Sequence, residues 1–226
     1  MSILPAAPSA PARRPPRTSP PPVRRRDQPP RMTEAEFLAF TRDPARVSDR
    51  PGAAYAPKYE LLEGGVVREM ANVRHTHAIL TGELHFQIRL LLDRERFVAY
   101  TESIKFRPRA CQIYCPDNVV APNPPELLDS YGDVVLNPVF LAEVLSDSTA
   151  DTDRGEKLDC YLGTPSVLEY WLVHQDRVRV ERYHREPGGS WPDEPEVHED
   201  RSAAVPLPAL GGAVPVGELY RQAVPG

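Results

Sequence analysis

Two acidic side chains stand where an acid is costly unless it has a partner. Glu143 interrupts an otherwise apolar run at residues 139–145, and Asp117 follows a proline and leads into Val119–Ala121. A carboxylate in a buried strand loses hydration worth on the order of several kcal/mol, so it must be paired, protonated or bound to a metal ion. Glu143 and Asp117 are therefore the first candidates for a chemical site.

A lysine follows the second of these acids on a predicted helix. Asp153, Lys157 and Tyr161 recur every four residues and share one face of that helix. Two acids on neighbouring strands with a lysine close behind is the arrangement that metal-dependent phosphodiester hydrolysis requires. We predict Asp117 and Glu143 as ligands of Mg²⁺ or Mn²⁺, with the carbonyl of Val144 as a third, because hard oxygen ligands suit these ions. Lys157 would stabilise the charge that builds on the phosphate.

The same residues also have structural interpretations. An ion pair with Lys157 or Arg154 would satisfy Glu143 equally well. Asp153 and Lys157, four residues apart, are typical of a solvated surface pair worth about 0.3 kcal/mol. Asp117 at a strand start, His77 on a long helix and Glu60 in a short strand each fit either a functional site or ordinary structure.

Composition divides the chain into two parts. Ten of the 27 prolines and seven arginines, with one acid, lie in the first 31 residues, so the net charge of −5 leaves −11 for residues 32–226. We interpret residues 1–31 as a disordered Pro/Arg-rich tail, because they hold too little apolar surface to offset the entropy of ordering. Residues 32–226 are long enough for one domain with a substantial core.

The charge and cysteine content limit the partners and the compartment. An acidic domain is not a general polyanion binder, so contact with nucleic acid must come from a local basic patch, from metal ions or from the tail. No apolar run of signal-peptide or membrane-spanning length is present, which predicts a cytoplasmic protein without membrane contact. Three cysteines fit free thiols, and a zinc site at Cys111 and Cys115 would lack a matching pair.

Hydrophobic periodicity predicts an α+β fold, a mixed α/β sheet flanked by helices. Thr33 and Glu36 match a capping box at the start of a helix, and Gly64–Gly65 marks a hairpin. The other expected elements are a helix at 75–94, strands at 97–106, 112–121 and 139–145, a helix through Asp153 and Tyr161, a hairpin at 169–183, a loop at 187–201, a short strand within 203–214 and a final helical turn at 218–221.

The order of several motifs resembles the Uma family of restriction endonucleases, a branch of the PD-(D/E)XK nuclease superfamily. The motifs are Tyr59–Gly64, His77, Pro116–Asp117, Glu143–Ser146 with Ser148–Thr149, Asp153 to Lys157 with Tyr161, and Glu169–Trp171. The likeness runs from about residue 32 to about residue 183 and leaves the tail uncovered.

The resemblance implies a restriction-endonuclease-like core that cuts DNA, with Asp117 and Glu143 as metal-binding acids and Glu60 as an additional upstream carboxylate. His77, Asp153 and Tyr161 are among the matching positions, and their expected roles are supporting ones: Asp153 would hold Lys157 and Tyr161 would contribute a hydroxyl. Nucleases of this kind commonly pair to cut two strands, so a homodimer is compatible with the resemblance. Two positions depart from the pattern. Leu145 occupies the usual place of the lysine, which implies that Lys157 has taken over that role, and Gly65 replaces a usual acid.

Two other functions remain open on the sequence. A catalytically silent binding or regulatory protein with the same fold would keep the acidic net charge without the strand lysine. A metal-dependent hydrolase of a phosphoester outside nucleic acids would show a closed small pocket in place of an open groove.

Overall fold

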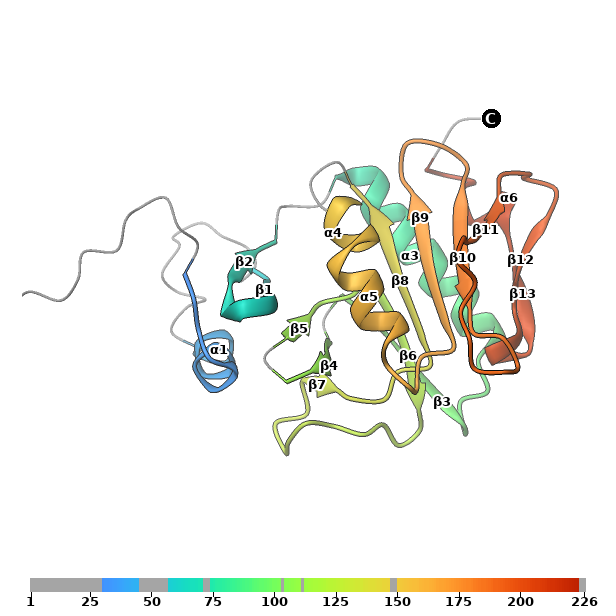
Figure 1. Ribbon diagram of the computed structural model, residues 1–226. Coiled ribbons are helices and arrows are strands. Elements are labelled where there is room, and N and C mark those ends of the chain that lie inside the picture. The colour runs from blue at the N-terminus through green and yellow to red at the C-terminus, as the bar shows by residue number, and fades with distance from the viewer. Residues whose placement is uncertain are drawn as a thin grey trace, which may run out of the picture.

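A computed structural model describes residues 30–44, 57–70, 74–102, 104–110, 112–146 and 150–223 (Figure 1). The predicted tail falls outside these residues except for its last two, of which Arg31 forms a β-bridge with Val66. Cys111, Ser148 and Thr149 also lie outside the described residues.

The central element is a six-stranded mixed sheet in the order β11-β10-β9-β8-β6-β3. Its strands are β3 (Phe97–Thr101), β6 (Asn118–Pro122), β8 (Phe140–Leu145), β9 (Glu169–His174), β10 (Val180–His184) and β11 (Glu196–His198). Only β8 and β9 pair in parallel within it, and the other neighbours are antiparallel. The parallel pair lies near the middle of the sheet, where both faces are covered, as its fully buried apolar sequence predicts.

Helices cover both faces of this sheet (Figure 1). The long helix α3 (His75–Leu91) packs Leu80, Leu84 and Ile88 against one face, together with Val144. On the other face α4 (Ala150–Arg154) and α5 (Glu156–Leu162) pack against the strand residues that alternate with the first set, such as Leu141. The alternation along β8 therefore sends Glu143 toward α5. The observed architecture confirms the predicted α+β fold.

A smaller five-stranded sheet stands beside the first, in the order β2-β1-β5-β4-β7. Its strands are β1 (Tyr59–Leu61), β2 (Val67–Glu69), β4 (Lys105–Arg109), β5 (Gln112–Tyr114) and β7 (Val134–Val135), and η1 (Glu63–Gly65) joins the first two. The helix α1 (Glu34–Thr41) covers this sheet with Phe37 and Leu38, and the capping box of Thr33 and Glu36 is present. The predicted hairpin at Gly64 is also confirmed, with φ of 71° at that glycine.

Two long strands predicted from the sequence are each divided between the two sheets. Residues 97–106 form β3 in one sheet and begin β4 in the other, and the chain turns at Glu102, whose φ is 35°. Residues 112–121 form β5 and β6, separated at Cys115–Asp117 by Pro116, which has no N–H to give to a ladder. Asp117 therefore lies at the crossing between the sheets and not inside a strand.

Three further expectations need correction. The expected loop at 187–201 contains β11, which pairs with β10. The single short strand expected within 203–214 is a hairpin of β12 (Ala204–Leu207) and β13 (Gly212–Pro215), turned through η2 (Pro208–Leu210) and followed by α6 (Val216–Leu219). The helix expected through Asp153 is broken at Gly155, whose φ and ψ of −110° and −103° are not helical. No helix in the described part of the chain has the length and apolar character to cross a membrane.

Candidate active site

Lys157 is surrounded by three carboxylates. Its Nζ lies 2.9 Å from Glu143 Oε1, 3.1 Å from Glu60 Oε1 and 3.1 Å from Asp153 Oδ1. None of these four residues is more than 3% exposed. The acids come from β8, β1 and α4, so three separate segments of the chain meet around one ammonium group. We call these four residues the Lys157 cluster.

The excess of acids sets the protonation of this cluster. Burial alone would lower the pKa of Lys157, but Glu143, Glu60 and Asp153 raise it well above its usual value. Lys157 is therefore a permanent cation near neutral pH and not a general base. Burial raises the pKa of Glu143 well above its usual value; Lys157 opposes this effect, and the charges of Asp153, Asp117 and Glu60 act in the same direction as burial.

Glu60 reaches the cluster from the smaller sheet. Its partner in the β1–β2 ladder is Arg68, which forms an ion pair with its Oε2, while the backbone N–H of Cys115 donates to Oε1 at 3.2 Å. Burial would raise the pKa of Glu60, but Lys157 and Arg68 lower it below its usual value. Arg68 also donates to Thr152 Oγ1 on α4 at 2.7 Å, so the hairpin is fixed to the helices of the main sheet.

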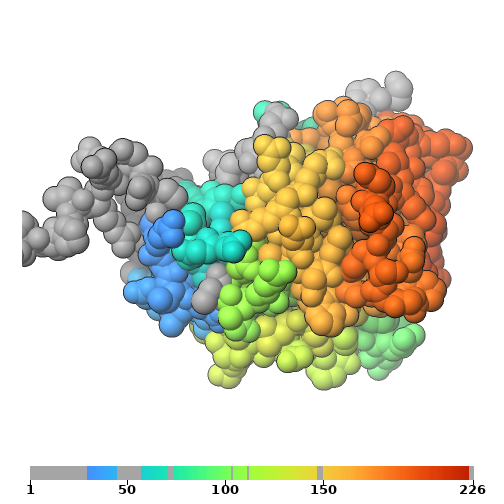
Figure 2. All heavy atoms as spheres, viewed as in Figure 1, coloured from blue at the N-terminus to red at the C-terminus, as the bar shows by residue number. Residues whose placement is uncertain are grey.

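The hairpin and α5 are in direct contact at the surface as well (Figure 2). The backbone N–H of Glu63 donates to Glu156 Oε1 at 2.8 Å, and the same oxygen accepts from the hydroxyl of Tyr114 at 2.7 Å. This contact holds the hairpin against α5, and Glu60, at the middle of a three-residue strand of that hairpin, is fully buried.

Tyr161 binds the same oxygen of Glu143 as Lys157 does. Its hydroxyl donates to Glu143 Oε1 at 3.0 Å, and burial raises the pKa of this phenol well above its usual value, so it remains a donor. The ring is fixed by edge contacts with Tyr114 and Tyr170, with centroids 5.7 and 5.0 Å away. Both described hydrogen bonds to Glu143 use Oε1, which leaves Oε2 for another partner.

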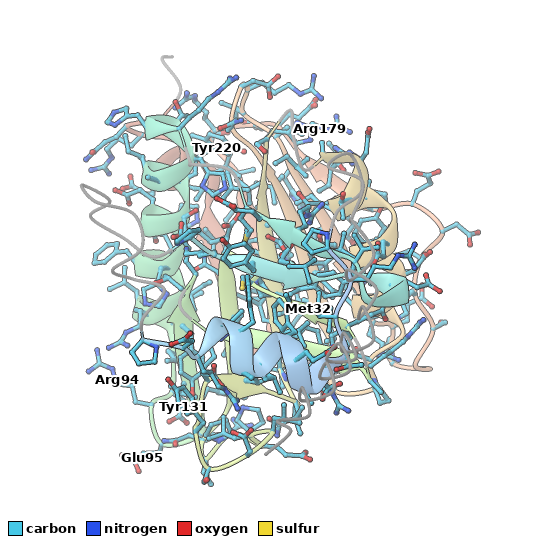
Figure 3. The ribbon with its side chains drawn as sticks, turned by 90° about the vertical axis from the view of Figure 1, so that its left-hand side faces the viewer. Met32, Arg94, Glu95, Tyr131, Arg179 and Tyr220 are labelled. Carbon is cyan, nitrogen blue, oxygen red and sulfur yellow. The ribbon has the colours of Figure 1, made fainter. Side chains whose placement is uncertain are left out.

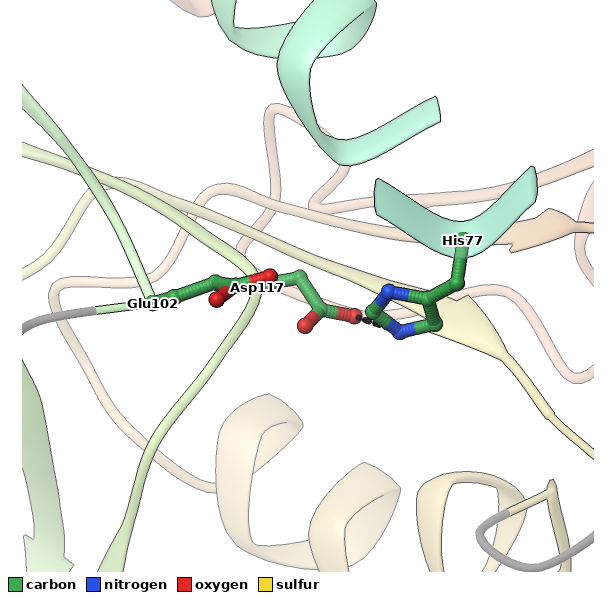
Figure 4. A group of neighbouring side chains, drawn as sticks. All are labelled: His77, Glu102 and Asp117. Atoms are coloured by element: carbon green, nitrogen blue, oxygen red, sulfur yellow. Dashed lines mark ion pairs between the residues drawn. The ribbon is translucent and has the colours of Figure 1, made fainter. Parts of the chain in front are cut away.

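Asp117 pairs with His77 and with the backbone of β8 (Figure 4). Asp117 Oδ2 lies 3.1 Å from His77 Nε2 on α3 and accepts from the N–H of Val144 at 2.7 Å. Burial would lower the pKa of His77, but the bond to Asp117 raises it above its usual value. The bond to Val144 brings Asp117 beside the residue that follows Glu143, and it is the connection between the two predicted metal ligands.

Glu102 joins His77 and Asp117, although its sequence context carries no motif. Ligand atoms of these three residues all lie within 4.8 Å of one another. The N–H of Glu102 donates to the carbonyl of Asp117 at 3.1 Å, and Lys58 Nζ lies 2.5 Å from its Oε2. The one signal in the sequence is a polar Thr-Glu-Ser interruption at 101–103 of an apolar run, which marks where the chain changes sheets.

The geometry of this second group fits a divalent cation. Two ligands on opposite sides of Mg²⁺ lie about 4.2 Å apart, so a set that spans 4.8 Å needs only small side-chain movements to close on one ion. The two carboxylates suit Mg²⁺ or Mn²⁺, whereas the imidazole of His77 would have to release its hydrogen bond to Asp117 before it could bind an ion. The carbonyl of Val144, the predicted third ligand, belongs to the same segment whose N–H binds Asp117.

The structure thus divides the predicted residues into two adjoining groups. Glu60, Glu143, Asp153, Lys157 and Tyr161 gather around the ammonium group, and His77 and Asp117 gather with Glu102. The predicted ion pair between Glu143 and Lys157 is present, whereas Arg154 pairs with Glu181. Asp153 and Lys157 are a buried pair and not the solvated pair that their spacing suggests.

Comparisons with known proteins agree with this architecture. A crystal structure of a "putative nuclease" from Anabaena variabilis superposes with a TM-score of 0.63 at 20% sequence identity, covering 85% of this chain and 99% of the other, so the two share a fold.

Two uncharacterized Synechocystis proteins are similar in sequence. The protein slr1290 is 31% identical over 165 residues, which are 73% of this chain and 84% of that protein. The protein sll1609 is 28% identical over 135 residues, which are 59% of this chain and 76% of that protein.

A family model described as "Putative restriction endonuclease" matches residues 49–215, which include every residue of both groups. This match extends well beyond residue 183, where the motif likeness weakens, and takes in β10, β11 and the β12–β13 hairpin. The chain belongs to the Uma2 family of restriction-endonuclease-like proteins.

Proposed function

We propose that this protein is an endonuclease that hydrolyses DNA phosphodiester bonds with the help of a divalent cation. The observation that carries the proposal is the meeting of Asp117, Glu102 and His77 within the span of one ion, directly beside a buried glutamate on β8. Family membership supports a nuclease, and the acid-rich site supports a metal-dependent one.

In this proposal Asp117 and Glu102 would hold Mg²⁺ or Mn²⁺ and Glu143 would contribute through Oε2, while His77, whose Nε2 pairs with Asp117 Oδ2, would orient that carboxylate. A divalent cation in such a site lowers the pKa of a bound water and neutralises charge on the phosphate. Asp117 Oδ2 already accepts two hydrogen bonds, so Oδ1 is the oxygen that would bind an ion. Residues 32–226 act as one nuclease domain, since the smaller sheet supplies Glu60 and the larger one supplies Glu143.

Lys157 serves this site by holding Glu143. At 1% exposure, with three carboxylates around it, its ammonium group contacts acids and not an open surface. We therefore assign the charge stabilisation predicted for Lys157 to an indirect route. Lys157 fixes Glu143 Oε1, Glu60 and Asp153 hold Lys157, and Tyr161 completes the support. The raised pKa of Lys157 keeps it a cation throughout.

A silent binding protein with this fold is the second candidate. One observation favours it: the ammonium group of Lys157 is already satisfied by three acids, and Leu145 occupies the usual place of a strand lysine. Such a protein would bind its partner without cutting DNA.

A nicking assay on supercoiled plasmid with Mg²⁺ or Mn²⁺ separates the two candidates. The native protein is expected to nick DNA in either metal and to lose at least about a hundredfold in rate in Asp117→Asn, an effect typical of removing one charged group at a reacting centre. Glu95→Gln is the matched control, because Glu95 is exposed at the far end of the molecule (Figure 3). Cleavage that survives Asp117→Asn and Glu143→Gln would overturn the proposed site, and no cleavage in either metal would favour the silent protein.

A further inference from the structure

The outer face of α3 carries large apolar side chains that are open to solvent within the described part of the chain. Phe86 and Leu90 are 55% and 65% exposed, and they lie one helical turn apart, so they form one surface. The half-buried Ile79 lies on the same flank of the helix. The helix runs along one edge of the molecule (Figure 3). Apolar side chains that adjoin on one exposed face are typical of a contact surface, unlike those scattered singly.

Smaller residues occupy the N-terminal half of the same face. Ala78 and Gly82 are exposed and are also one turn apart. A Cβ atom added at Gly82 would meet no other atom within 4 Å, so the surface is open there. The face is therefore raised at Phe86 and Leu90 and shallow at Ala78 and Gly82.

This order of large and small residues is self-complementary. In a two-fold symmetric dimer the same patch of both subunits meets, so each large side chain needs a small one opposite it. When two copies of α3 pack antiparallel around an axis at the level of Leu84, Phe86 lies over the partner subunit's Gly82, and Leu90 faces the partner subunit's Ile79. A parallel pair would set Phe86 against its own copy and leave the shallow half of the face unfilled.

The charges at the two ends of the helix favour the same antiparallel arrangement. The N-terminal end of α3 carries a partial positive charge and the exposed His75. In the antiparallel pair it lies beside the C-terminal end of the partner helix, which carries a partial negative charge and is followed by the exposed Asp93. Symmetry repeats this complementary contact at the other end of the interface.

We propose that this face of α3, formed by Ala78, Ile79, Gly82, Phe86 and Leu90, is the interface of a homodimer in solution. The helix has 17 residues and is about 25 Å long, so one helix pair gives an interface at the small end of the specific range, below about 1,200 Å². We therefore expect a reversible dimer with a dissociation constant in the micromolar range. The proposal is independent of DNA cleavage, because none of these five residues belongs to the candidate active site.

Sedimentation velocity of the full chain, over a concentration series across the micromolar range, tests the dimer. The native protein is expected to pass from monomer to dimer, and Gly82→Lys is expected to weaken the dimer at least tenfold, because a charged side chain then fills the shallow half of the face. The substitution fits the monomer, since the site is open and lysine is a better helix former than glycine. Its Tm is therefore expected to be at least that of the native protein, which separates a lost interface from a lost fold.

Gly188→Lys is the matched control. Gly188 is also exposed, a Cβ there would likewise meet no atom within 4 Å, and the change in charge is the same. This variant is expected to dimerise like the native protein. Equal weakening in the two lysine variants would show an effect of charge alone and overturn the interface. A native protein that stays monomeric throughout the series, as it would if another segment of the chain covered this face, would overturn it as well.

Cross-linking with a short bismaleimide tests the antiparallel orientation. In the antiparallel pair Ala78 lies at the level of the partner subunit's Arg89, whereas the two positions are about 16 Å apart within one chain. The double variant Ala78→Cys/Arg89→Cys is expected to give a covalent dimer on a denaturing gel, and each single variant is expected to give none above the native chain, whose three cysteines set the background. Absence of the covalent dimer in the double variant, or its appearance in a single variant, would overturn the antiparallel interface.

Discussion

Two buried charge clusters of this protein are built with opposite ratios of acid to base. The Lys157 cluster has three carboxylates around one ammonium group. The Glu181 cluster has one carboxylate held by Arg154, Arg179 and His174, with His174 Nε2 and Arg179 Nε both 2.9 Å from Glu181 Oε1. Arg179 lies at the end of the molecule opposite to Arg94 (Figure 3).

The ratio of carboxylates to basic groups differs between the two clusters, and so does the direction in which the pKa of the central glutamate is shifted. Burial would raise the pKa of Glu181, but its three basic partners lower it well below its usual value. Around Lys157 the outcome is reversed: burial raises the pKa of Glu143 well above its usual value, Lys157 opposes this effect, and the neighbouring acids Asp153, Asp117 and Glu60 add to it. In the Glu181 cluster the basic side chains outnumber the carboxylate that they bind. The Lys157 cluster and its neighbour Asp117 contain more carboxylates than cations, which favours the binding of an added cation.

The largest test of this comparison is Lys157→Met. Removing this cation leaves Glu143 and Asp153 without their ammonium partner and Glu60 with Arg68 alone, so we expect a loss of about 3–5 kcal/mol in the free energy of unfolding. Urea denaturation followed by circular dichroism measures it. The double variant Lys157→Met/Glu60→Gln removes one acid as well and is expected to recover part of the loss. A loss below about 1 kcal/mol would mean that the acids are not held by Lys157.

A divalent cation tests the spare negative charge directly. At a Mn²⁺ concentration 100 times its dissociation constant, binding to the native state is expected to add about 2.7 kcal/mol to the free energy of unfolding. EDTA removes the gain, which differential scanning calorimetry follows as a fall in Tm. Asp117→Asn and Glu102→Gln are expected to abolish the shift, while Glu181→Gln retains it. A shift that persists in Asp117→Asn would place the ion elsewhere.

The pH dependence of stability tests the Glu181 cluster. Because the folded pKa of Glu181 is depressed, its contribution is fully present above the unfolded value of about 4.3 and is lost as the pH falls toward the lower folded value. We expect Glu181→Gln to cost about 2 kcal/mol at pH 7, the scale of hydrogen bonds to a charged group, and progressively less below pH 4. Urea midpoints measured between pH 3 and 7 give this difference, and a cost that does not change with pH would contradict the assignment.

Arg179→Met should have the smallest effect. Arg154 and His174 remain on Glu181, and Arg179 is 27% exposed, so we expect a loss of at most about 1 kcal/mol by the same urea measurement. The informative quantity is the difference between this loss in the free energy of unfolding and the loss in Lys157→Met. Similar losses in the two variants would show that both clusters depend equally on each cation, and the comparison would fail.

The buried strand and its acid could be predicted because the physical constraint is local. Glu143 stands in an apolar run, and such an acid requires a partner within reach. Lys157, on the helix that follows the strand, is that partner. The convergence of Asp153, Lys157 and Tyr161 also survives the helix break at Gly155, because one irregular residue shifts the face only slightly. Glu60 was placed by family resemblance, since a three-residue strand has no periodicity to interpret.

Glu102 could not be predicted because its position depends on long-range topology. The segments on either side of it look like one strand, and only the formation of two sheets turns the chain there and brings its carboxylate to Asp117. The C-terminal hairpin was missed for a related reason. Its strands are short and half exposed, and their pairing is set by contacts with α3 that the local pattern does not encode.

The bond from the N–H of Val144 to Asp117 has a consequence for how this family is interpreted. The β6–β8 ladder ends at the pair Asn118 and Ala142, and the carboxylate of Asp117 takes the place of the next backbone acceptor along β8. The acid is thus part of the secondary structure as well as of the proposed cation site. A relative that does not cleave DNA would still be under pressure to keep an oxygen there, so the presence of this aspartate in a relative is not by itself evidence of an active enzyme.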